Sequence, residues 1–420
     1  MRNIIFILSL SFASNLLYSA IDPTFTDTTK SLKTNTPSNH APKEWYQKIS
    51  LKGYTQVRYN RFLETNPNLV CEACDRSVGN NQGIYLRRAR LVYSGQIHQR
   101  VYIYTQIEMA QQINRDNQNF GQLRDAYMDL GLDNNNEFRV RLGLSKVPYG
   151  FTNMQSSQNR LALDRDEAIN SGVPNERDMG AYLFYTPLKK KELFKKLVSD
   201  GLKGTGDYGI FAFGYYNGQS PNKPEENNGM HVVGRFTYPV EIGNQVIEAG
   251  VQGFTGAWTM PTANLSSKSV KTNGNRTYKD ERVAGSFVLY PKPFGIQFEY
   301  NVGSNPKFNG KDSIVDGKIN GFSALVNYRY VYNNQVFFPF VRYSKYTGGK
   351  KLELDARYYE VTETEFGIEW EPVKQFELTI AYNVAQRLYS DMLVPTNTAT
   401  GLHSITQAGK FLRIQAQFNF

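Results

Sequence analysis

The last eleven residues of the chain, 410–420, constrain its fold more than any other stretch. Apolar and polar side chains alternate along them, with Leu412, Ile414, Ala416, Phe418 and Phe420 on one face and Arg413, Gln415, Gln417 and Asn419 on the other. A period of two residues is that of a β-strand. A soluble sandwich gains nothing from a terminal Phe, whereas the last strand of a membrane barrel closes against the first and carries an aromatic residue at the interface. The C-terminus therefore predicts a transmembrane β-barrel.

The first twenty residues predict secretion. Arg2 supplies a short basic region, the residues after it an apolar core, and Ser19 and Ala20 a small-residue cleavage point. This pattern predicts a signal peptide over 1–20, with an uncleaved anchor as the alternative. Residues 21–44 are rich in Thr, Ser, Pro and Asn and lack periodicity, which predicts a flexible periplasmic tail.

The composition of the remaining chain fits a barrel better than a helical membrane protein. No apolar run approaches the ~20 residues that a membrane helix needs. The mean hydropathy of −0.50 is compatible with a barrel, because half of each strand faces water in the lumen. Aromatic residues make up 14% of the chain, which suits belts at the membrane interfaces. No linker divides the chain after residue 44, so a single barrel domain is expected over 45–420.

The chain is basic, with a formal net charge of +10. A basic balance suits nucleic acid, anionic lipid or anionic solutes. Secretion and the lack of a dense basic stripe argue against nucleic acid, which leaves outer-membrane lipid and small anions as expected partners.

Sixteen segments carry alternation or an enrichment in aromatic and β-branched residues, which predicts sixteen antiparallel strands. An even number is what single-chain bacterial barrels require. The predicted strands are 46–62, 84–97, 100–112, 122–132, 136–146, 177–187, 205–217, 229–241, 244–257, 276–291, 294–304, 315–332, 335–346, 357–371, 374–387 and 408–420.

The connections between these strands alternate in length. Tight turns are expected at 97–100, 133–136, 241–244, 291–293, 333–334 and 371–374, and long polar loops include 63–83, 147–176, 258–275 and 388–407. Short periplasmic turns and longer extracellular loops are the asymmetry of a membrane barrel. One turn departs from the rule, since 188–198 has an amphipathic helical pattern. That helix either collects anions at the periplasmic mouth or only caps the barrel rim.

Sequence motifs for catalysis are missing. The chain has no Gly-rich phosphate loop, no HExxH and no G-x-S-x-G, so we predict that it is not an enzyme and needs no cofactor or metal. Cys71 and Cys74 are the only cysteines and lie in the first long loop. A local disulfide is expected there, because this loop would lie in an oxidising compartment. Redox activity and structural zinc are the alternatives.

Alternation also assigns the side chains that face the lumen. In strand 136–146, lipid contact is expected for Phe138, Val140, Leu142 and Leu144, which turns Arg139 and Arg141 inward. The same reasoning places further basic residues in the lumen: Arg58, Arg88, Arg90, Arg329, Arg387 and Arg413. An Arg at the lipid midplane would cost roughly 2–4 kcal/mol. Acids with the same phase are Glu108, Asp125, Asp129, Glu299, Glu365 and Glu377, so a mixed wall with a cationic excess is predicted.

Four ordered motifs carry a resemblance to a known family. They are LRRARL at 86–91, LRDAY at 123–127, RLGLSKVPYG at 141–150 and ERDMG at 176–180. With them and its terminal Phe, the chain resembles the phosphate-selective porins of the porin O and P family.

The resemblance implies a trimeric sixteen-stranded barrel whose third outer loop folds into the lumen as a constriction. On this chain that loop spans about 147–176 and follows Lys146. Family analogy makes Lys146, Arg160, Arg165 and Arg177 anion contacts, since guanidinium groups and lysine suit phosphate oxygens. The same region also contains five acids, Asp164, Asp166, Glu167, Glu176 and Asp178. Phosphate, another anion or a general solute therefore all stay open as the cargo.

The function predicted from sequence is passive diffusion of small hydrophilic solutes across a bacterial outer membrane. Inward Arg and Lys would favour anions, with phosphate as the candidate, and the protein would assemble as a homotrimer. The alternatives are a structural or adhesive barrel that binds an external partner through its loops, and a secreted soluble β-rich binding protein.

Overall fold

The computed structural model describes residues 44–65, 83–111 and 119–420. All of these belong to one structural unit, Glu44–Phe420. The predicted signal peptide, the tail up to residue 43, and both Cys71 and Cys74 lie outside the described residues. None of the described helices is long and apolar enough to cross a membrane.

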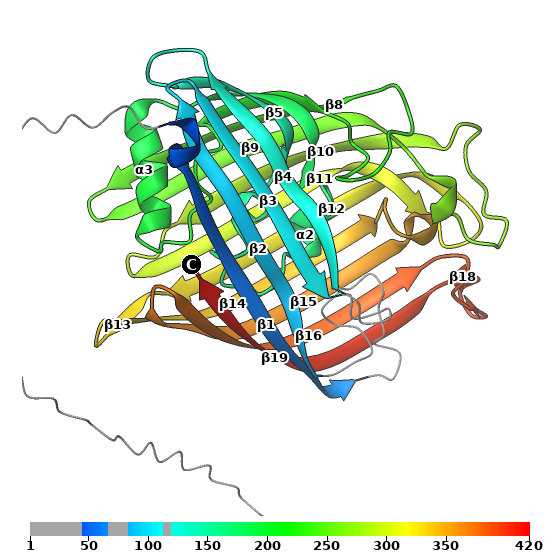
Figure 1. Ribbon diagram of the computed structural model, residues 1–420. Coiled ribbons are helices and arrows are strands. Elements are labelled where there is room, and N and C mark those ends of the chain that lie inside the picture. Colours follow the sequence, from blue (N-terminus) through cyan, green and yellow to red (C-terminus); the bar gives the residue numbers. More distant parts are fainter. Residues whose placement is uncertain (1–43, 66–82, 112–118) are drawn as a thin grey trace, which may run out of the picture. The chain divides into compact units, whose positions relative to one another are not determined.

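The described residues form a closed antiparallel barrel of sixteen strands, which confirms the predicted fold (Figure 1). In the order in which they pair, the strands are β1 (Ile49–Thr65), β2 (Gly83–His98), β3 (Val101–Gln111), β4 (Asn119–Gly131), β5 (Phe138–Lys146), β6 (Arg177–Tyr185), β7 (Phe211–Tyr216), β8 (His231–Ile242), β9 (Gln245–Thr259), β10 (Thr277–Leu289), β11 (Phe294–Phe308), β12 (Ile314–Tyr328) with β13 (Tyr330–Tyr332), β14 (Gln335–Gly349), β15 (Tyr358–Val373), β16 (Phe376–Ser390) and β19 (Ile405–Asn419). β12 and β13 both pair with β14 and together make one barrel strand.

Short elements complete the unit. They are the helices η1 (Trp45–Lys48), α1 (Phe151–Met154), α2 (Glu167–Asn170), α3 (Leu188–Ser199), η2 (Thr262–Asn264) and η3 (Leu354–Ala356), and the strand pair β17 (Thr396–Asn397) and β18 (Leu402–His403).

The last strand closes the barrel against the first, as its sequence predicted. β19 pairs antiparallel with β1, with Ile414 opposite Tyr59, and with β16 on its other side. The terminal Phe420 extends this ladder, because its main chain exchanges two hydrogen bonds with Gly53, of 2.9 and 3.0 Å. The Phe420 ring itself is exposed, at the end of the barrel that carries the short turns.

Alternating burial separates an inner polar face from an outer apolar face. In β5, Phe138 and Leu142 are each 45% exposed, whereas Arg139 and Arg141 are buried. Leu144 differs from its prediction, since it is buried near the end of β5. Hydrophobic side chains on the outer face suit contact with lipid. Near the short-turn end this face carries paired rings, such as those of Phe337 and Trp370 and of Phe376 and Phe418.

One predicted strand begins later than expected. The pattern predicts a strand over 205–217, but β7 starts only at Phe211. Gly206 and Gly209 have φ of +87° and +79°, in the left-handed region, and this interrupts β geometry. The residues before β7 instead belong to a long connection at the short-turn end, which contains the predicted amphipathic helix as α3.

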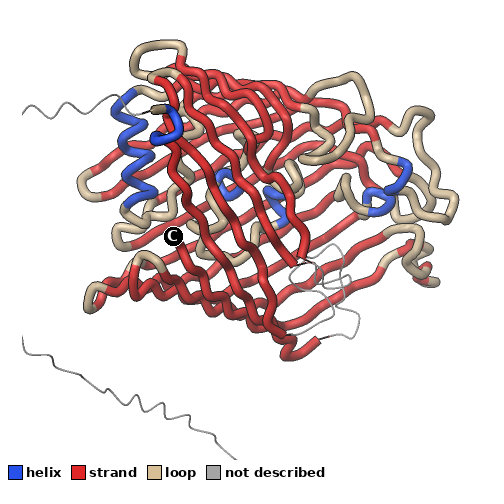
Figure 2. The backbone as a smooth tube through the Cα atoms, viewed as in Figure 1, coloured by secondary structure: helices blue, strands red, loops and turns tan. Residues whose placement is uncertain are grey.

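Two segments enter the barrel interior, and Figure 2 shows the short helices of the first inside the ring of strands and the longer helix of the second at the short-turn end. The first, residues 147–176, is called the inner loop below and contains α1 and α2. Its Leu161 and Ala162 pack against Leu325 of β12 and Phe338 of β14. The second segment is the connection 186–210, whose helix α3 buries its apolar face.

Candidate functional site

Two β-bulges add arginines to the inner face of the barrel. In β2 the register with β1 shifts between Leu86 and Arg88, which leaves Arg87 as the extra residue. In β4 the register with β3 shifts between Leu123 and Asp125, which leaves Arg124 as the extra residue. A bulge turns an extra side chain away from strict alternation. Both arginines consequently line the same interior cavity.

The inner loop is fastened to the barrel wall by hydrogen bonds from its own main chain. The amides of Phe151 and Thr152 donate to the Glu299 carboxylate of β11, at 2.6 and 2.9 Å. On the opposite wall, the Gln56 amide of β1 donates to the main-chain oxygen of Ser157, at 3.1 Å. The loop therefore crosses the lumen, and its charged side chains meet those of the wall.

Asp164 of the inner loop is shared by three arginines from three strands. Its carboxylate lies 2.5 Å from Arg58 of β1, 3.0 Å from Arg87 of β2 and 2.8 Å from Arg413 of β19. Arg58 is fully buried and also donates to Gln415 and to the oxygen of Leu163. One negative charge thus faces three positive ones.

Glu108 of β3 is shared in the same way. It pairs with Arg90 and lies 3.7 Å from Arg88 and 3.9 Å from Arg124. Arg90 also donates to the Tyr54 hydroxyl at 2.7 Å. These contacts hold the guanidinium groups in place without neutralising all of them.

Glu176, at the end of the inner loop, is the third shared carboxylate. It lies 3.3 Å from Arg124, 2.9 Å from Arg165 and 2.7 Å from Arg177. Arg177 pairs in addition with Asp125 at 2.9 Å. Arg165 further donates to three main-chain oxygens of the inner loop, and this fixes its position.

We call these residues the arginine cluster. Its eight arginines are Arg58, Arg87, Arg88, Arg90, Arg124, Arg165, Arg177 and Arg413, and its four acids are Glu108, Asp125, Asp164 and Glu176. Counted over these described residues, positive charge exceeds negative charge by four.

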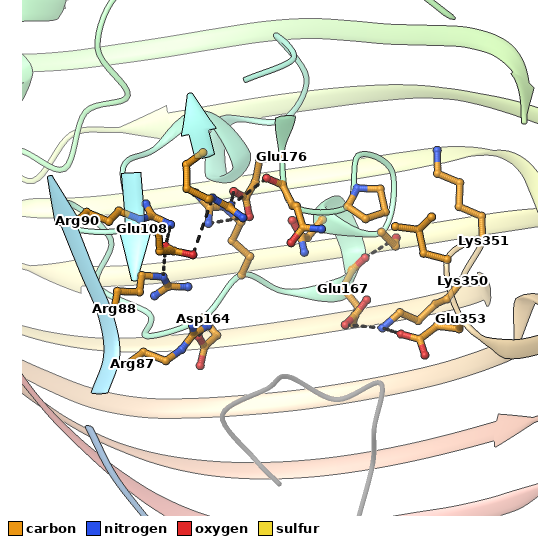
Figure 3. Close-up of a pocket in the computed structure, with 17 residues that line it drawn as sticks. Arg87, Arg88, Arg90, Glu108, Asp164, Glu167, Glu176, Lys350, Lys351 and Glu353 are labelled. Atoms are coloured by element: carbon orange, nitrogen blue, oxygen red, sulfur yellow. Dashed lines mark hydrogen bonds and ion pairs between the residues drawn. The ribbon is translucent and has the colours of Figure 1, made fainter. Parts of the chain in front are cut away.

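A cavity of about 280 Å³ opens beside the cluster (Figure 3). Arg87, Arg88 and Arg90 lie on one side of it, and Lys350, Lys351 and Glu353 of the loop after β14 on the other. Lys350 bridges Glu167 of α2 and Glu353. Although burial opposes its charge, these two carboxylates raise the pKa of Lys350 above its ordinary value.

Arg139 and Arg141 form a separate group closer to the short-turn end. Arg141 binds Asp129 through two bonds, of 2.7 and 2.8 Å, and lies over the Tyr127 ring. Arg139 lies 2.9 Å from Asp207 and 3.8 Å from Asp129. Here two arginines meet two acids, so this group carries no excess charge.

Three further predicted residues form no ion pair with the four acids of the cluster, although Lys146 shares the Gln155 oxygen with Arg165 and Arg160 shares the Leu163 oxygen with Arg58. Lys146 donates to the main-chain oxygens of Met154 and Gln155, both at 2.7 Å, and so holds the inner loop closed. Arg160 is buried within the inner loop and leaves its Nε and Nη1 without a hydrogen-bond partner. Arg329 lies between β12 and β13 at the short-turn end and is partly buried.

The remaining acids of the inner region are held by other contacts. Asp166 caps α2 by accepting from the Ile169 amide and also accepts from Ser323. Asp178 accepts from the amides of Gly218 and Ser220. Neither belongs to the arginine cluster, so these two acids do not offset its positive charge.

Sequence reasoning missed Arg87, Arg124 and Lys350. A signal for the first two existed, because Arg87 and Arg88 are consecutive and so are Arg124 and Asp125. Strict alternation would turn one residue of each pair toward lipid at a cost of roughly 2–4 kcal/mol, so a bulge is the cheaper solution. No local pattern marks Lys350, whose partner Glu167 is 183 residues away.

A family model described as phosphate-selective porin O and P matches residues 69–420. A search of curated proteins finds no match.

Among solved structures, the outer membrane channel DcaP of Acinetobacter baumannii shares 12% identity at a TM-score of 0.50, over 89% of this chain and 97% of that one. OmpF of Salmonella typhi, in a complex with daunomycin, shares 12% at 0.54 over the same fractions. An anion-selective porin from Comamonas acidovorans shares 11% at 0.50, over 89% of this chain and 99% of that one. At such low identity these likenesses support the fold alone.

Proposed function

The chain belongs to the phosphate-selective porin O and P family, and from this premise we propose that it is an anion-preferring porin with phosphate as its candidate solute. The family and the barrel are those of a passive outer-membrane channel and not of an enzyme. The short-turn end then faces the periplasm and the long-loop end the outside.

The observation that carries the anion preference is the sharing of carboxylates in the arginine cluster. Asp164, Glu108 and Glu176 each lie within 4 Å of three arginines. Each shared carboxylate offsets the repulsion among the guanidinium groups around it, so that these groups can lie close together. An excess of positive charge nevertheless remains beside the cavity. An anion entering that cavity replaces part of its hydration with guanidinium donors.

Release of the anion requires that no single site bind it too tightly. The cluster meets this requirement, because each of the cavity-lining Arg88, Arg90 and Arg124 already has a carboxylate within 4 Å. Several moderate contacts in series permit both entry and exit. The bulged Arg87 and Arg124 raise the number of such contacts on one wall.

Reconstitution in a planar bilayer under a KCl gradient tests the proposal. An anion-preferring pore gives a reversal potential of the sign set by chloride, and added phosphate blocks the chloride current. A reversal potential of the opposite sign contradicts the anion preference, and an absence of phosphate block contradicts phosphate as the solute. The structural or adhesive alternative predicts no current at all.

Two further features stay predictions. A homotrimer follows from the family resemblance, and chemical crosslinking in mild detergent tests it. A disulfide between Cys71 and Cys74 follows from the compartment, and thiol labelling with and without reductant tests it.

A further inference from the structure

The connection 186–210, called the strap below, crosses the barrel at the short-turn end. It leaves β6 and returns to β7, yet its Lys203 binds side chains of β15. β6 is the sixth and β15 the fourteenth of the sixteen barrel strands, so they lie half a circumference apart. The strap therefore spans the lumen instead of following the rim as a short turn would.

Both halves of the strap are fixed to the interior. Leu193, Phe194 and Leu197 of α3 are buried in one cluster with Phe151 of the inner loop and Tyr290 near β10. After the helix, Gly201 and Lys203 take φ of +67° and +61°, which bends the chain inward. Near β7, Asp207 accepts from Thr186 at 2.7 Å and pairs with Arg139.

The strap lies directly against the inner loop. The side-chain amide of Gln155 donates a hydrogen bond to the main-chain oxygen of Lys203 at 2.6 Å. Lys203 binds Glu369 and Glu371 near the short-turn end of β15, whereas the inner loop meets the arginine cluster near the middle of β1, β2 and β19. The two segments therefore form successive obstacles along the barrel axis. A solute that passes the arginine cluster meets the strap next.

Lys203 is the charged centre of this second obstacle. It is 4% exposed, pairs with Glu369 and lies 2.8 Å from Glu371. Carboxylate oxygens of Glu369, Glu371 and Glu377 all lie within 4.8 Å of one another. Although burial opposes its charge, Glu369 and Glu371 raise the pKa of Lys203 above its ordinary value. One cation is thus set among three acids.

We propose that the strap is a second constriction of the channel, in series with the inner loop, and that Lys203 determines how readily anions pass it. With Lys203 present, one positive charge offsets part of the negative charge of the carboxylates on β15 and β16. Without it, three acids face the lumen alone and repel anions. The proposal rests on the chain being a channel, and it holds whichever ion the arginine cluster prefers.

The test compares Lys203→Met, Lys203→Arg and wild type in planar bilayers, with the chloride-to-potassium permeability ratio taken from the reversal potential. Lys203→Met is expected to lower the ratio at least about threefold, because two unit charges about 4 Å apart interact by about 1 kcal/mol even in bulk water. Lys203→Arg keeps the charge and is expected to retain the wild-type ratio. Lys195→Met is the matched control, because Lys195 is an exposed lysine of the same segment.

An unchanged ratio in Lys203→Met overturns the proposal. If this variant does not give the heat-modifiable band of a folded barrel, Glu371→Gln replaces it. That variant removes one acid while Lys203 keeps Glu369, so the ratio is expected to rise, and an unchanged ratio again overturns the proposal. A cation-selective wild type would refute the proposed anion preference, while the shift between variant and wild type would still test the strap.

Discussion

From the arginine cluster we predict that Arg124→Gln weakens the block of the chloride current by phosphate. Arg124 lines the cavity and lies near two carboxylates, Glu108 and Glu176. Each of these keeps other arginine partners in the variant. The substitution therefore removes one positive charge from the cavity without leaving a buried acid unpaired, and the barrel is expected to assemble.

The magnitude follows from the Coulomb interaction between a bound anion and the lost guanidinium group. At about 4 Å a pair of unit charges interacts by about 1 kcal/mol in bulk water and about 4 kcal/mol at an effective dielectric constant of about 20. Since about 1.4 kcal/mol corresponds to a tenfold change, the phosphate concentration for half-maximal block is expected to rise at least about fivefold.

The assay is titration of the chloride current with phosphate in a planar bilayer, at fixed voltage and ionic strength. Arg100→Gln is the control, because Arg100 lies exposed in the turn between β2 and β3 and lines no part of the cavity. Added salt should weaken the block in wild type, since screening reduces interactions between charges. A half-blocking concentration that is the same in Arg124→Gln and wild type would refute the assignment of the cluster as the anion site.

Three further predictions concern stability and the loops. Arg141→Ala breaks a buried two-bond pair with Asp129, so it is expected to lower the free energy of unfolding by ~3 kcal/mol in urea titrations and to change ion selectivity less than Arg124→Gln does. Gly143→Ala puts a Cβ 2.3 Å from a main-chain oxygen at φ +122°, and should reduce the yield of heat-modifiable barrel, whereas Gly285→Ala, with no atom within 4 Å of the new Cβ, should not. Because the pKa of Lys350 is raised, its ammonium group stays charged up to a pH above the ordinary lysine pKa of ~10.4. Its ion pairs are lost only when the pH rises beyond that value, so proteolysis within 350–357 should be equally slow at pH ~7 and ~9.5.

The barrel was predictable from the sequence because its strands obey a local rule. Residues that alternate in polarity must face lipid and lumen in turn, and the terminal strand 408–420 shows this directly. The connections were predictable for the same reason, since a tight turn such as 333–334 leaves no room for other structure. The strap was only half predictable, because its helix has a local period while its reach to Glu369 depends on contacts 166 residues away.

The lining of the lumen was predictable in part. Alternation turned Arg58, Arg139 and Arg413 to the inner face, where the structure buries all three. It gave no means of telling which of them share an acid. Arg139 belongs to a group with equal charges, whereas Arg58 and Arg413 meet at Asp164 with an excess of positive charge. Partner choice depends on the path of the inner loop, which a single sequence does not specify.

The sign of the charge beside the cavity shows why contacts matter more than composition. Along the chain, the region 147–178 holds five acids and three arginines, which argues against an anion site. In space, two of those acids, Asp166 and Asp178, cap main-chain amides, and Glu167 pairs with Lys350. The other two, Asp164 and Glu176, are outnumbered by arginines that arrive from β1, β2, β4 and β19. The acids of the loop thus serve as the anchors that gather guanidinium groups from the wall, so a loop that is acidic in sequence builds a site that is basic in space.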